Sequence, residues 1–148
     1  MIALLIFGIY TFLAVYNAGN MLSLQMQHYG IYPFIGKEHF KTYMEANIKA
    51  AFIPAVIPGM LTLLLSIILL FFHPAFMTSL EGIISFALNI IAFFSTFKWQ
   101  RPLQSDMAQN GYDEKKIRLL LHTNWIRTLA YFALGILMTS ILLSTQFN

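Results

Sequence analysis

One arginine is set apart from the other charged residues of this chain. Arg127 lies inside an apolar stretch of about residues 117–143. If the apolar layer begins near Leu119, a rise of ~1.5 Å per helical residue places this guanidinium ~12 Å inside it. A charge at that depth is costly, and such residues usually belong to a site. The planar fork of donors suits an anionic or carbonyl-bearing ligand, and the alternative is a purely structural role in joining helices.

Amide and hydroxyl side chains repeat at helical spacing in three apolar stretches, and Asn124 and Tyr131 fall on the same helix face as Arg127. The stripes in the first and third stretches are Tyr10, Asn17, Asn20 and Gln27, and Ser85, Asn89, Ala92 and Thr96. Packing these faces together would form a polar pocket. The ligand-contacting residues expected there are Asn17, Asn20, Asn89, Asn124 and Tyr131. The alternative is that these side chains only join helices by hydrogen bonds.

Three histidines, His28, His39 and His122, fall near the same end of the apolar stretches. Three imidazoles could bind Zn, Fe or Cu. No two of them have the i, i+3 or i, i+4 spacing that would force a shared geometry, so a metal site is the less favoured interpretation. The chain has no cysteine, which excludes thiolate ligands and disulfides. The sequence identifies no cofactor.

Acid–base groups near Arg127 would complete a catalytic site. His39 and Tyr43 share a helix face at i, i+4 spacing, and His122 lies at the start of the last apolar stretch. Each of the three could donate or accept a proton. The catalytic set predicted from the sequence is therefore Arg127, as the holder of an oxyanion or carbonyl, with His122, His39 and Tyr43.

Trp99 and Arg101 follow the third apolar stretch directly. Such residues often anchor a helix at the membrane–water interface. They could also contact a ligand by forming a lid over the mouth of the expected pocket.

Four apolar stretches must position these side chains. They span about residues 2–26, 50–72, 80–97 and 117–143, each near the ~20 residues needed to cross a hydrocarbon layer of ~30 Å. Hydrophobic residues make up 58% of the chain and charged residues 10%, which is typical of a membrane protein. We expect one all-α domain over residues 1–148, an antiparallel bundle of four transmembrane helices. A helical extension starting near Gly36 should lead into the second helix.

Basic residues predict the orientation of this bundle. Of the nine Lys and Arg, all but Arg127 lie in or beside the first and third connections, and the termini and the second connection have none. The positive-inside rule makes the first and third connections cytoplasmic. The expected location is a multi-pass protein of the cell (inner or plasma) membrane with both termini non-cytoplasmic.

Four short motifs occur in order along most of the chain: Ala18-Gly19, Pro58, Arg101-Pro102-Leu103-Gln104, and Trp125 with Arg127. Together they resemble the anthrone-oxygenase-like family of four-span membrane proteins, which usually has Asn where this chain has Gln104. The resemblance implies a four-helix membrane fold and is compatible with oxygenase or oxidoreductase chemistry.

The leading hypothesis is an oxidoreductase-like membrane protein with an intramembrane pocket for an aromatic or quinone-like molecule. One alternative is a non-enzymatic bundle that serves as an accessory subunit or binds lipid. Another is a small transporter or channel subunit, assembled from identical copies, although no Asp or Glu lies deep in a span. Expected partners are membrane lipids and a lipophilic small molecule. Nucleic acid is not expected, because the basic residues are few and lie beside the apolar stretches.

Overall fold

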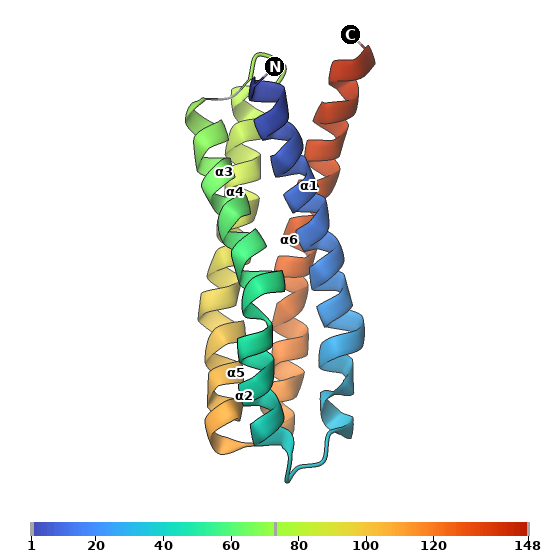
Figure 1. Cartoon of the computed structure of the whole chain (residues 1–148), viewed down its shortest axis with the longest axis vertical. Helices are drawn as coiled ribbons and strands as arrows, with labels where there is room; N and C mark the ends of the chain where they lie inside the picture. The colour runs from blue at the N-terminus through green and yellow to red at the C-terminus, as the bar shows by residue number, and fades with distance from the viewer. Residues whose placement is uncertain (1, 73, 148) are drawn as a thin grey trace.

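The computed structural model of the chain describes residues 2–72 and 74–147, without the side chains of residues 146 and 147. Its elements are all helical and run antiparallel in a long bundle (Figure 1). In chain order they are α1 (Ile2–Ser23), η1 (Leu24–His28), η2 (Tyr29–Phe34), α2 (Phe40–Ala50), η3 (Phe52–Val56), α3 (Ile57–Phe71), α4 (Ser79–Ser95), η4 (Thr96–Gln100), α5 (Arg101–Asn110) and α6 (Glu114–Phe147).

Four helical stretches are long and apolar enough to cross a membrane. They cover Ile2–Phe34, Phe52–Phe71, Ser79–Asn110 and Glu114–Thr145. The fold class expected from the sequence is therefore confirmed, and the chain has the architecture of a multi-pass membrane protein. The first and third helices run further than their apolar residues do, because polar residues continue the helix past the point where hydropathy falls. As a result, residues 98–110, expected as a connection, are helical.

The four spans pack in a ring, in which α6 contacts α1 and α4, and α3 contacts the same two helices from the other side. Large apolar side chains cover the outside of the bundle. Phe12, Leu129 and Ile136 are 68%, 62% and 66% exposed. In water such a surface would be strongly unfavourable, whereas lipid tails solvate it.

A second layer of core lies at the end opposite the termini, where α2 packs against α5 (Figure 1). Its buried residues are Tyr29, Tyr32, Phe40, Met44, Met107, Ala108, Ile117 and Leu120. The helical extension expected before the second span is α2. It begins at Phe40 and not near Gly36, and residues 37–39 form a turn.

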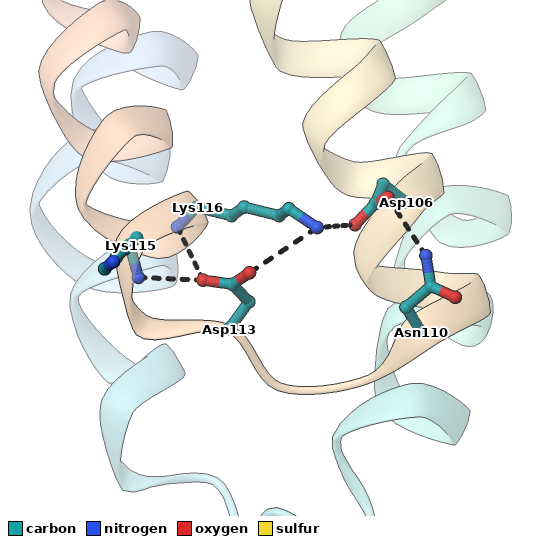
Figure 2. A network of polar contacts seen from close by, with 5 residues as sticks. All are labelled: Asp106, Asn110, Asp113, Lys115 and Lys116. Carbon is teal, nitrogen blue, oxygen red and sulfur yellow. Dashed lines mark hydrogen bonds and ion pairs between the residues drawn. The ribbon is translucent and has the colours of Figure 1, made fainter.

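Local sequence fixes how α6 begins. Gly111 adopts a φ of 85°, a conformation that favours glycine, and ends α5. The Asp113 carboxylate then accepts from the backbone N–H groups of Lys115 (2.9 Å) and Lys116 (3.1 Å). The Lys116 ammonium reaches back to Asp113 and across to Asp106 on α5 (Figure 2). These contacts hold the ends of α5 and α6 together.

Three spans contain a wider π-helical turn: η1, η3 and η4. Proline accounts for two of them, because Pro58 and Pro102 follow η3 and η4 and cannot donate a backbone hydrogen bond. The carbonyl of Pro54, which Pro58 would otherwise bond, accepts from Asn20 Nδ2 (2.8 Å) and Tyr16 Oη (3.0 Å) instead. Side chains of α1 thus satisfy a backbone group that lipid could not.

Candidate functional site

Arg127 points into the bundle and is 7% exposed. Its Nε donates to Asn124 Oδ1 one turn earlier on α6, and its Nη2 donates to Tyr29 Oη at 2.7 Å. Asn124 Nδ2 donates in turn to Gln25 Oε1 at 2.7 Å, and Gln104 Nε2 donates to Tyr29 Oη at 2.9 Å. We call these five residues, Gln25, Tyr29, Gln104, Asn124 and Arg127, the Arg127 centre. They come from η1, η2, α5 and α6.

Two donors of this centre have no acceptor among the described residues. Arg127 Nη1 bonds to none of the described residues. Tyr29 Oη receives two N–H groups, and its own proton has no acceptor in the part of the chain that the structure describes. A guanidinium N–H and a phenol O–H both strengthen their bonds when the acceptor carries negative charge. The centre is thus equipped to donate to a carbonyl or anionic group.

The charge of Arg127 has no counter-charge. No carboxylate of the described residues lies within ion-pair distance of it, and the ion pairs of the chain involve surface groups such as Glu114 with Arg118. A guanidinium withdrawn from water without a carboxylate costs free energy that neutral amide and phenol partners recover only in part. An anionic ligand would supply the missing charge.

A second chain of hydrogen bonds lies next to this centre. Asn47 Nδ2 on α2 donates to Tyr32 Oη at 2.9 Å, and Asn47 Oδ1 lies 2.7 Å from His28 Nε2. The rings of Tyr29 and Tyr32 pack with centroids 5.4 Å apart. This packing connects α2 to the centre and fixes the orientation of the Tyr29 ring.

The amides expected to line one pocket belong to separate groups of contacts. Asn124 lies in the Arg127 centre, whereas Asn20 bonds the Pro54 carbonyl. Asn17 Nδ2 bonds Thr62 Oγ1 at 2.7 Å on α3, and Asn89 Nδ2 bonds Tyr10 Oη at 2.8 Å on α1. Tyr131 is buried against α3. Helical spacing predicted which helix faces point inward. The amides lie at different heights along the bundle, however, so each bonds a different partner and they do not form one pocket.

A groove of about 320 Å³ lies between α1 and α6, beyond the Arg127 centre toward the termini. It is lined by Val15, Ala18, Phe132, Gly135, Ile136, Thr139 and Ser140. The residues are mostly apolar or small, and Arg127 is not one of them. This groove therefore does not match the polar pocket predicted around Arg127.

The predicted catalytic histidines do not converge on Arg127. His39 is 81% exposed beside Glu38, and His122 lies on the outward face of α6. Tyr43 packs its ring against Tyr32, and partial burial raises its pKa. His122 does not reach Arg127 because the two residues lie on different faces of α6, so that burying Arg127 leaves His122 exposed.

The three histidines proposed as metal ligands also stay apart. His28 bonds Asn47, while His39 and His122 are exposed. Among the described residues, no group of three His, Asp or Glu side chains is arranged to hold a metal ion. The structure therefore gives the metal interpretation no geometric support.

Trp99 and Arg101 belong to a continuous helix and not to a loop. Lys98 Nζ lies 4.9 Å from the Trp99 ring, and Arg101 Cζ lies 5.6 Å from the Phe97 ring. Such cation–aromatic pairs are typical of residues at a membrane interface.

Sequence reasoning missed three members of the centre: Gln25, Tyr29 and Gln104. Gln25, Tyr29 and Tyr32 have i, i+4, i+7 spacing, which was a usable signal. The stripe drawn through Gln27 was wrong at that end, because the buried face of α1 continues from Ala18 and Met21 to Gln25 at helical spacing and leaves Gln27 exposed.

Comparison of the chain with protein-family models, with curated proteins and with solved structures found no match. The function is therefore inferred from the geometry of the Arg127 centre.

Proposed function

We propose that the Arg127 centre binds a membrane-resident molecule through a carbonyl or anionic head group. The observation that carries this proposal is a buried guanidinium with no carboxylate partner and with an Nη1 group free to donate. Tyr29 adds a second free donor beside it. The surrounding spans are apolar, which suits a lipophilic body attached to that head.

Reduction of a bound quinone-like carbonyl by a separate electron or hydride donor is the enzymatic form of the same proposal, in which this chain supplies charge stabilisation and a proton. The resemblance to anthrone-oxygenase-like proteins and the aromatic residues Tyr29 and Tyr32 both favour an aromatic or quinone-like ligand. A carbonyl oxygen held by Arg127 would accept negative charge more readily, as in an oxyanion hole. Tyr29, which touches Arg127, is the nearest group able to supply a proton to that oxygen.

The proposal includes an orientation in the plasma (inner) membrane. All the Lys and Arg residues except Arg127 belong to or adjoin the segments at the α2/α5 end of the bundle. That end would face the cytoplasm, with both termini on the other side. The Arg127 centre would then lie in the cytoplasmic half of the membrane.

Ligand binding to the protein in lipid nanodiscs tests the proposal with two probes, oleate as a long-chain carboxylate and a short-chain benzoquinone as a carbonyl. We expect one of them to bind the wild-type protein and to bind Arg127→Gln at least about tenfold more weakly. The reason is that a hydrogen bond to a charged group is worth ~1.5–3 kcal/mol and tenfold corresponds to ~1.4 kcal/mol. Tyr29→Phe should weaken the same probe.

Arg118→Gln is the matched control, because Arg118 is exposed on the same helix and pairs with Glu114. Its affinity should equal that of the wild type. Equal affinity of Arg127→Gln and wild type for both probes would refute the proposal. The probe that responds also separates an anionic ligand from a neutral carbonyl.

The second candidate is a non-enzymatic bundle in which the buried polar groups only join helices. It is favoured by the contacts that Asn17, Asn20 and Asn89 make with neighbouring spans. It also accounts for the bonds of Arg127 to Asn124 and Tyr29. It does not account for the free donors of Arg127 and Tyr29.

A further inference from the structure

Two amide oxygens at the middle of the bundle have no hydrogen-bond partner. Asn17 and Asn89 are 0% and 1% exposed, and Oδ1 of each bonds none of the described residues. They lie on α1 and α4, in spans where lipid offers no donor. Buried polar atoms in proteins are nearly always paired, so two unpaired acceptors on the inward faces of opposite spans indicate a missing donor.

The orientation of both amides is fixed by their nitrogen atoms. Asn17 Nδ2 faces the Pro58 carbonyl at 3.4 Å as well as Thr62 Oγ1, and Asn89 Nδ2 faces the Ser85 carbonyl at 2.9 Å. A carbonyl can only accept. Rotating either amide by half a turn would therefore set its oxygen against that carbonyl and would leave its nitrogen, in place of its oxygen, without a partner.

A free donor lies against the turn of α3 that one of these amides also contacts. Tyr131 Oη has no partner in the described residues, and it lies 3.3 Å from the point where a Cβ on Gly59 would be. Gly59 adjoins Pro58, the residue whose carbonyl Asn17 bonds. A phenol donor and an amide acceptor thus meet the same turn of α3.

We propose that bound water occupies the centre of this bundle and donates to Asn17 Oδ1 and Asn89 Oδ1. A water molecule near Asn17 would also accept from Tyr131 Oη, which gives it the two or more polar partners that buried water requires. Water is the smallest neutral group able to both donate and accept. A cation is the poorer fit, because no carboxylate accompanies the two amides.

This hydration links the four spans at mid-membrane. Asn17 bonds Thr62 of α3, Asn89 bonds Tyr10 of α1, and Tyr131 belongs to α6. Polar groups then continue along the inward face of α6 through Thr128 to Asn124 of the Arg127 centre. The interior is a hydrated polar seam and not a uniformly apolar core. This inference stands independently of whether the Arg127 centre binds a ligand.

Radiolytic hydroxyl-radical labelling in nanodiscs, read by mass spectrometry, tests it, since a buried ring is labelled only where water is bound beside it. We expect label at Tyr131 and Tyr10 of the wild-type protein. Met138, fully buried on α6 and more reactive than tyrosine, should stay unlabelled as the dry reference. Exchanging sodium for choline should change nothing.

Asn17→Leu should remove the label from Tyr131, and Asn89→Leu should remove it from Tyr10. Asn20→Leu is the matched control, because Asn20 lies at the half-buried edge of α1 and its amide bonds the Pro54 carbonyl. This variant should be labelled as the wild type is. Wild-type Tyr131 and Tyr10 labelled no more than Met138 would overturn the proposal without any variant. Labelling that depends on sodium would overturn it in favour of a bound cation.

Discussion

At the scale of single residues, Arg127 separates the two functional proposals. Among the described residues, its five N–H donors meet only two acceptors, Asn124 Oδ1 and Tyr29 Oη. If the residue serves a ligand, its buried charge lowers stability in the free protein, as strained or unpaired groups at functional sites often do. If it only joins helices, its removal should be strongly destabilising.

We expect Arg127→Gln to change the free energy of unfolding by no more than ~1 kcal/mol, because removing an unpaired buried charge offsets the lost hydrogen bonds. Reversible unfolding in mixed detergent micelles measures this change. Arg118→Gln, on the exposed face of α6, provides the baseline. A loss of ~3 kcal/mol or more in Arg127→Gln would instead support the structural role.

Among the elements, the second span is the one whose shape depends most on a neighbour. Pro58 cannot donate to the Pro54 carbonyl, and Asn20 and Tyr16 of α1 donate to it instead. The irregular turn η3 is therefore stabilised by side chains of another helix. Its energetics should be coupled to those of α1.

A double-mutant cycle tests this coupling. Asn20→Leu alone should cost ~1 kcal/mol, because the Pro54 carbonyl loses its shorter bond. In the background of Pro58→Ala, whose backbone N–H can bond that carbonyl, the same change should cost clearly less. Unfolding free energies of the four proteins in micelles give the coupling, and strictly additive values would contradict it.

The start of α6 makes a prediction about pH. Backbone N–H bonds from Lys116, with further help from its ammonium, hold the pKa of Asp113 below its ordinary value of 3.8. A carboxyl whose pKa is lowered on folding stabilises the fold above its unfolded pKa, and the effect is lost as pH falls through the lower, folded value. Acidification below about pH 4 should therefore loosen the α5–α6 connection.

Thermal unfolding in detergent between pH 2 and 7 measures this effect. Asp113→Asn keeps an acceptor at the start of the helix but loses the charge. Its Tm should be lower than that of the wild type at neutral pH and should fall less on acidification. Glu45→Gln, which removes an exposed carboxylate outside any ion pair of the described residues, is the control. Parallel pH curves for wild type and Asp113→Asn would refute the assignment.

For the whole molecule, the separation of charge along the bundle predicts its orientation. The chain has no cysteine, so single cysteines report topology without background. Ala75→Cys in the α3–α4 connection should react with an impermeant maleimide in intact cells, and Gln109→Cys at the end of α5 should react only after lysis. Both positions are exposed. The reverse pattern would invert the proposed orientation.

Hydropathy and charge in the sequence were enough to predict the four spans, the helical extension before the second span and the clustering of basic residues at one end. Crossing lipid demands apolar helices of a set length, and this requirement is local in sequence. The inward direction of Arg127, on one face with Asn124, was also predictable, since helical periodicity and the cost of a charge in lipid suffice for it.

The partners of Arg127 were decided by the tertiary structure. Gln25 and Tyr29 reach it because the first span continues as helix through η1 and η2, and Gln104 reaches it because the third span continues as helix past Pro102. Depth and rotation together decide which amides meet, so Asn17, Asn20 and Asn89 found partners away from Arg127. Spacing within one helix specifies a face, but only the packing of several helices determines which atoms on those faces come within hydrogen-bond distance.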